Sequence, residues 1–105
     1  ACGTVSLIAW EILCKTIEAS MSISDLDAAR AMRCLKFCSR SHYAIEAGES
    51  ATAGLAGLIL TANTSALKQK LQIDKDSQIL LIGSEGVTDR DIYNKIMTNE
   101  LLSEA

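Results

Sequence analysis

A continuous aliphatic run at residues 78–82, QILLI, is the feature that most constrains what this chain can fold into. An apolar run without polar alternation is typical of a strand that is buried on both faces, as in a parallel sheet covered by helices. Residues 42–47 predict a second, weaker strand. Two strands are too few for a self-sufficient parallel sheet, so the sequence predicts the edge of a larger α/β domain.

The helical spacing of apolar residues predicts about five helices around these strands. Ser24 and Asp27 have the spacing of a capping box, in which two side chains satisfy each other's backbone amides at a helix start. The strand–helix–strand portion implies a right-handed parallel crossover. The expected helices lie at about residues 6–17, 24–38, 51–62 and 65–71, and a last helix begins at about residue 89.

The length and the charge of the chain limit its function. Its 105 residues amount to one domain or less. The net charge of −3 comes without a basic stripe, which argues against a nucleic-acid binder. No apolar run approaches the roughly 20 residues of a membrane span, and the first residues lack the features of a signal peptide. We therefore expect a cytoplasmic protein that binds neither nucleic acid nor a membrane.

The four cysteines are expected to be reduced, mostly buried thiols, because no secretion signal is visible. Cys34, Cys38 and His42 lie four residues apart and would share one face of a continuous helix. A structural zinc site needs four ligands, and a fourth is not evident in the sequence. The sequence therefore predicts no metal site.

Two glycine-containing turns follow the predicted strands and form the candidate binding site. Ligands of open α/β sheets bind beyond the carboxyl ends of the strands, so we expect both turns to meet there. Backbone amides and hydroxyls suit a polar or anionic ligand, whereas carboxylates suit an amine. Alternatively, the glycines only permit tight turns and the polar side chains cap helices. The turns are Gly48-Glu49-Ser50 and Gly83-Ser84-Glu85-Gly86.

The chain has no self-contained catalytic apparatus in its sequence. The single histidine, His42, has no obvious acidic partner, and no Walker loop, GxGxxG or HExxH motif occurs. The six lysines are each expected to be solvated on a helix or a turn. We therefore expect no catalytic residue within this chain.

Three segments follow one another in the order of a known family: ACG at residues 1–3 with AWEIL at 9–13, GESATAGL at 48–55, and ILLIGSEGVTD at 79–89. Together they span nearly the whole chain and resemble the C-terminal part of diaminopropionate ammonia-lyases, whose typical patterns are ACGxxxxxxWEIL, GESGAxGL and LLISTEGxTD. Two positions depart from these patterns. Gly83-Ser84 stands in place of Ser-Thr, and Ala51 replaces the second glycine of GESG.

The resemblance implies the tryptophan-synthase-β fold type of pyridoxal-phosphate enzymes. Residues 1–105 would then be a single region, the C-terminal fragment of a larger enzyme domain. The expected fold class is α/β, the C-terminal part of a three-layer αβα domain with a small parallel sheet of two strands and about five helices. Enzymes of this family eliminate ammonia from 2,3-diaminopropionate to give pyruvate, a step of amino-acid catabolism. Pyridoxal phosphate acts as the electron sink once a lysine has removed the α-proton.

The resemblance also implies roles for the two turns. Ser84, after Gly83 and before Glu85, would bring a neutral hydroxyl to the pyridine nitrogen, and the turn Gly48-Glu49-Ser50 would form part of the same pocket wall. The cofactor-binding lysine and the glycine-rich phosphate loop belong to the N-terminal part of such enzymes, so this chain alone would not be catalytic. The expected partners are that N-terminal portion, a small amino-acid substrate and a second subunit in a homodimer.

Two other interpretations remain open at this point. One is a stand-alone small-ligand-binding or regulatory α/β domain, for which a well-folded monomer without an exposed apolar patch is expected. The other is a fragment of a threonine or serine dehydratase of the same fold type. The AWEIL segment and Glu85-Gly86 favour the ammonia-lyase over the dehydratase.

Overall fold

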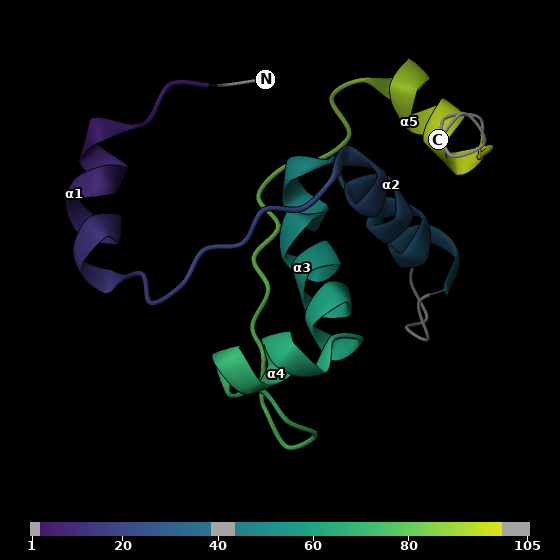
Figure 1. Ribbon diagram of the computed structural model, residues 1–105. Coiled ribbons are helices and arrows are strands. Elements are labelled where there is room, and N and C mark those ends of the chain that lie inside the picture. Colours follow the sequence, from purple (N-terminus) through teal and green to yellow (C-terminus); the bar gives the residue numbers. More distant parts are fainter. Residues whose placement is uncertain (1–2, 39–43, 100–105) are drawn as a thin grey trace.

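The computed structural model describes residues 3–38 and 44–99, and over these residues the elements are all helical (Figure 1). A π-helical turn, η1 (Cys34–Cys38), directly continues α2, and a 3-10 turn, η2 (Ser50–Thr52), leads into α3. The expected number of five helices is confirmed. The helices are α1 (Leu7–Thr16), α2 (Asp25–Arg33), α3 (Ala53–Ala62), α4 (Ser65–Leu71) and α5 (Arg90–Met97).

The predicted α/β class with a small parallel sheet is wrong, because no strand occurs in either described part of the chain. A strand needs a ladder of backbone hydrogen bonds to a neighbouring strand. Near the ends of the two segments predicted as strands, a single such bond joins Gly48 N to Glu85 O (3.2 Å). The amide of Ile45 instead donates to Leu35 O in η1 (3.2 Å). Residues 42–43 of the first predicted strand lie outside the described residues.

The aliphatic run at residues 78–82 lies alongside α3 without secondary structure of its own (Figure 1). Its side chains alternate, since Ile79 and Leu81 are 44% and 42% exposed whereas Leu80 and Ile82 are 85% and 81% exposed. A Cβ atom placed on Gly54 of α3 would lie 3.3 Å from Leu81 Cδ2, so the less exposed face contacts α3 at a glycine. The run at residues 78–82 was predicted to be buried on both faces, but it is only partly covered, on one face.

Side-chain caps fix the starts of three helices. Ser24 and Asp27 form the predicted capping box, in which Asp27 N donates to Ser24 Oγ (3.1 Å) and Ser24 N donates to Asp27 Oδ2 (3.4 Å). Ser6 caps α1 and Asp89 caps α5, each by accepting from the amide three residues further on. These short-range contacts explain why the starts near residues 6, 24 and 89 are found where the sequence predicts them.

The core lies where α2 packs against α3 and α5. α2 buries four residues, three of which are alanines, and alanines let neighbouring helices approach closely. Ala29 and Met32 of α2 form one apolar cluster with Tyr93 and Ile96 of α5. The core is therefore small. It joins α2, the second helix of the chain, to α5, the last helix.

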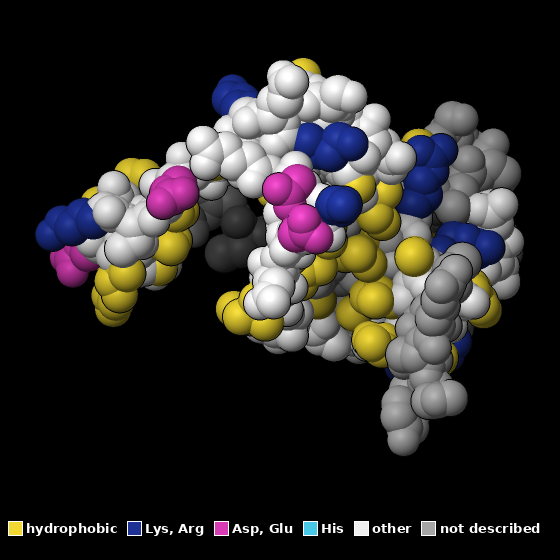
Figure 2. Space-filling model, turned by 90° about the horizontal axis from the view of Figure 1, so that it is seen from below, with side chains coloured by type: hydrophobic (Ala, Val, Ile, Leu, Met, Phe, Trp, Pro, Cys, Tyr) yellow, Lys and Arg dark blue, Asp and Glu magenta, His cyan; other side chains and the backbone are white. Residues whose placement is uncertain are grey.

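α1 stands apart from the other helices (Figure 1), and none of its residues is buried. Figure 2 shows hydrophobic side chains on this helix and again on the face of the helical body that is turned to the viewer. None of the helices in the described ranges has the length and apolar character that a membrane crossing requires. The exposed large apolar residues of the N-terminal segment are Val5, Leu7, Ile8, Trp10, Ile12, Leu13 and Ile17.

Truncation of Ile96 tests this description of the core. Ile96 is 1% exposed, so Ile96→Ala leaves a cavity between α2 and α5, and we expect it to lower the free energy of unfolding by about 2–5 kcal/mol. Ile92→Ala is the matched control, because Ile92 lies one turn earlier on α5 and is 41% exposed. Urea denaturation measures both variants, and equal losses would contradict the packing.

Candidate functional site

The two segments predicted as turns lie side by side, although no sheet of described residues brings them together. Residues 48–50 lead through a turn into η2, whereas no turn forms at residues 83–86, and we keep the names first turn and second turn for these two segments. Gly48 N donates to Glu85 O (3.2 Å), and the Glu85 side chain lies over the buried Gly48. A Cβ atom on Gly48 would overlap Glu85 Oε1 and would lie 2.6 Å from Gly86 O. None of the glycines in the described residues has a positive φ, so Gly48 is required for this close approach and not for its backbone conformation.

Thr52 anchors the first turn to α2. Its side chain is fully buried, and its hydroxyl lies 3.0 Å from Glu49 O, 3.3 Å from Gly48 O and 3.4 Å from Ala28 O of α2. A hydroxyl has one proton to donate, so these carbonyls share it. A residue outside the predicted set therefore fixes the position of the turn relative to α2.

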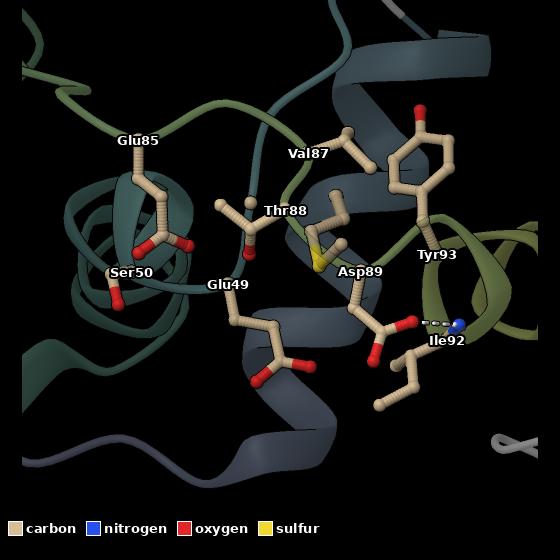
Figure 3. Close-up of a pocket in the computed structure, with 10 residues that line it drawn as sticks. Glu49, Ser50, Glu85, Val87, Thr88, Asp89, Ile92 and Tyr93 are labelled. Carbon is tan, nitrogen blue, oxygen red and sulfur yellow. Dashed lines mark hydrogen bonds between the residues drawn. The ribbon is translucent and has the colours of Figure 1, made fainter. Parts of the chain in front are cut away.

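A hollow of about 320 Å³ opens beside the first turn (Figure 3). Its walls include the carboxylates of Glu49, Glu85 and Asp89 and the hydroxyls of Ser50 and Thr88, and no lysine or arginine is among the described residues that line it. The Asp89 carboxylate also caps α5, where it accepts a backbone amide at 3.0 Å. We call this space the acidic hollow, and its charge favours a cationic or amine-bearing ligand over an anion.

The second turn borders a different space. Gly83 and Ser84 line a hollow of about 560 Å³, and the rest of its lining comes from η1, η2, α3, residues 45–47 and the neighbouring residues Leu81, Glu85 and Gly86. Glu85 borders both this space, which we call the Ser84 hollow, and the acidic hollow. The six predicted site residues are thus divided: the first turn lies in the acidic hollow, Gly83 and Ser84 lie in the Ser84 hollow, and Glu85 lies at both.

The first turn forms one wall of the acidic hollow, and the residues of the second wall are not among the six predicted site residues. Residues 87–89 and Tyr93 of α5 form this wall, opposite the first turn. Tyr93 is 4% exposed, and its hydroxyl has no hydrogen-bond partner in the part of the chain that the structure describes. Burial raises the pKa of Tyr93, and the negative charge of Glu46 raises it further. The i, i+3 spacing of Tyr93 and Ile96 is the sequence signal for an inward face that includes Tyr93.

Glu46 is a further residue that sequence reasoning missed. Its Oε1 accepts from Lys36 Nζ (3.0 Å), and its Oε2 accepts from Arg90 Nη1 (2.5 Å). The hydrogen bond from Arg90, followed by that from Lys36, holds the pKa of Glu46 below its ordinary value of 4.5. The partners lie 10 and 44 residues away along the chain, so no local sequence pattern marks this bridge.

The cysteines differ from their prediction. Cys14 is exposed and Cys34 is half-buried, and both are free thiols, so the expectation of mostly buried thiols is wrong for Cys14. No group of three or more potential metal ligands comes together within residues 3–38 and 44–99. His42, the third member of the candidate zinc set, lies outside the described residues.

Adding a methyl group at Gly48 tests the contact between the turns. Gly48→Ala forces Glu85 and Gly86 away from the first turn, and we expect this overpacking to cost about 1–3 kcal/mol of the free energy of unfolding. Gly86→Ala is the matched control in the facing turn, because a Cβ atom there meets no other atom within 4 Å. If urea denaturation shows the same stability for both variants, the turns do not pack as described.

This chain is similar to part of two bacterial diaminopropionate ammonia-lyases. Diaminopropionate ammonia-lyase from Escherichia coli (strain K12) is 33% identical over 100 residues, which cover 92% of this chain and 25% of the relative. The enzyme of the same name from Salmonella typhimurium is 33% identical over 104 residues, which cover 94% of this chain and 26% of the relative. The chain therefore spans about a quarter of the length of these relatives.

No family model matches the chain, and no solved structure matches it. The part of the relatives that aligns is their C-terminal quarter. The resemblance predicted from the three motifs is confirmed: over nearly its whole length, this chain is similar to the C-terminal quarter of diaminopropionate ammonia-lyase.

Proposed function

We propose that this chain is the C-terminal part of a pyridoxal-phosphate-dependent lyase that eliminates ammonia from 2,3-diaminopropionate to give pyruvate. The observation that carries the proposal is the similarity over 92–94% of the chain to proteins named diaminopropionate ammonia-lyase. The motifs at residues 48–55 and 79–89, which contribute to this resemblance, contain the two turns that meet in the structure. The chain would contribute a wall of the cofactor pocket and would not be catalytic alone.

The residues of the Ser84 hollow fit one edge of the cofactor. Ser84 offers a neutral hydroxyl, which suits a pyridine nitrogen that is not protonated. A Cβ atom on Gly83 would lie 3.3 Å from Ala51 O, so the backbone next to Ser84 packs closely against Ala51, while Ser84 itself is exposed. No lysine or arginine lines either hollow in the described residues, so groups that bind the phosphate and the aldehyde would come from elsewhere in the protein. When bound, the cofactor supplies the electron sink for the elimination.

The acidic hollow fits the charge of the substrate. 2,3-Diaminopropionate has two amino groups, and the carboxylates of Glu49 and Glu85 lie next to the first turn without a cation in the lining. Carboxylates near a bound amine favour its protonated form and orient it by hydrogen bonding. In this proposal Glu85, which borders both hollows, lies between the substrate and Ser84.

Exposed apolar side chains support the proposal that another part of the protein packs against this chain. Leu80 and Ile82 are more than four-fifths exposed, and α1 presents apolar residues with none of them buried. Contiguous exposed apolar surface marks an interaction site, whereas a stand-alone binding domain would be expected to cover such side chains. We propose that the N-terminal portion of the same enzyme provides that cover.

The lyase proposal is tested with the protein made from the complete reading frame that contains this chain. After incubation with pyridoxal phosphate, we expect it to release pyruvate and ammonia from 2,3-diaminopropionate. We expect Ser84→Ala to lower kcat by about threefold to tenfold, the loss of one hydrogen bond, and the exposed Ser65→Ala on α4 to leave kcat unchanged. Failure of the folded, cofactor-bound protein to release pyruvate would refute the proposed activity.

A further inference from the structure

Glu46 joins the two walls of the acidic hollow from outside. It lies two residues before Gly48, where the wall formed by the first turn begins. Arg90, to which it is bonded at 2.5 Å, directly follows Asp89 in the opposite wall and is the first residue of α5. The Glu46–Arg90 contact therefore connects segments that are 44 residues apart and that face each other across the hollow.

Two more contacts extend this connection. Lys36 of η1 bonds the other carboxylate oxygen of Glu46 at 3.0 Å, so both oxygens of the carboxylate have a cationic donor. The guanidinium of Arg90 also lies over the ring of Tyr93, 5.2 Å from its centroid. Tyr93 lines the hollow, so the bridge reaches a wall residue directly. Three segments, η1, residues 44–48 and α5, thus converge on one side chain.

We propose that Glu46 is a positioning residue that sets the separation of the two walls of the acidic hollow, and thereby the affinity of the hollow for an amine-bearing substrate. The part of this inference that concerns substrate rests on the proposed lyase function. The part that concerns the walls rests on the contacts of Glu46 alone. Glu46 lines the Ser84 hollow but not the acidic hollow, and within the described residues its carboxylate bonds Lys36 and Arg90 and neither Glu49 nor Glu85. It therefore acts on the acidic hollow through Arg90 and through the chain that leads to Gly48.

The charge state of Glu46 supports this role at neutral pH. Hydrogen bonds from Arg90 and Lys36 lower the pKa of Glu46 from its ordinary value of 4.5, so the carboxylate is ionised at neutral pH. A carboxylate with a lowered pKa stabilises the folded arrangement above its ordinary pKa, and this stabilisation is lost as the pH falls through the lowered value. The charged and titratable groups that act on Glu46 are Lys36, Arg90 and Tyr93. The bridge is therefore present at neutral pH and is lost in acid.

Ion pairs that are exposed to solvent contribute little individually, so the expected effect is modest. Lys36, Glu46 and Arg90 have side chains that are 30%, 39% and 59% exposed, which leaves them open to screening by salt. The bridge acts by restraining residues 44–48 next to the acidic hollow, and it does not contribute to the packing of the core. Its loss would loosen the walls without unfolding α2 and α5, whose packing comes from buried apolar residues.

Hydrogen exchange of the Gly48 amide tests the proposal on the protein from the complete reading frame. This amide donates to Glu85 O, two residues before the second wall begins at Val87, so its exchange reports separation of the segments that form the two walls. We expect Glu46→Gln to raise its exchange rate by about twofold to fivefold, and to raise KM for 2,3-diaminopropionate by a similar factor. Glu46→Asp, which keeps the charge, is expected to restore part of both. Glu18→Gln removes the same charge from an exposed position beyond α1 and is expected to change neither.

The outcomes separate the two proposals. Unchanged Gly48 exchange in a folded Glu46→Gln protein would overturn the positioning role, as would faster exchange with an unchanged KM. A wild-type protein without lyase activity would refute the proposed function, while Gly48 exchange would still decide whether Glu46 holds the walls. If Glu46→Gln does not fold, Gly48 exchange is measured in the wild-type protein at about 0.05 M and about 0.5 M salt. Salt screens the ion pairs of Glu46, so we expect faster Gly48 exchange at the higher concentration. No salt effect there would overturn the role.

Discussion

The small side chains of α2 are the constraint on which the rest of the structure depends. Three of its nine residues are buried alanines, which let α3 and α5 pack directly against the helix. Thr52, buried at the start of α3, then reaches the backbone of α2 and holds the turn at residues 48–50.

The sequence predicts the helices well and the sheet wrongly, for physical reasons. Helix starts depend on contacts within three or four residues, such as the capping box of Ser24 and Asp27, and these are visible in the sequence. The run at residues 78–82 indicates side chains that need cover, but it does not say which element supplies the cover. In this chain α3 covers one face of the run, and the other face is exposed. Likewise, Ile92 and Ile96 are one helical turn apart in the sequence, yet Ile96 is buried and Ile92 is 41% exposed.

The candidate site shows the same division between local and distant information. The contact between the two turns was predicted from a rule for parallel sheets, yet it is made by Gly48, whose missing side chain leaves room for Glu85. The sequence shows that residue 48 is a glycine, but it does not show that Glu85 occupies the space that a side chain would fill. Glu46 could not be found, because its two cationic partners come from distant parts of the chain. The roles of Ser84 and of the first turn in cofactor binding remain proposals that rest on the resemblance.

The central claim, that this chain provides one wall of a pyridoxal-phosphate pocket, is tested most directly by the absorbance spectrum of the cofactor. Pyridoxal phosphate is added to the protein made from the complete reading frame and, separately, to this chain alone. The claim predicts that the complete protein changes the spectrum of the free cofactor and that the chain alone does not, because no lysine lines either hollow in its described residues. A folded complete protein that leaves the spectrum of the free cofactor unchanged would contradict the claim.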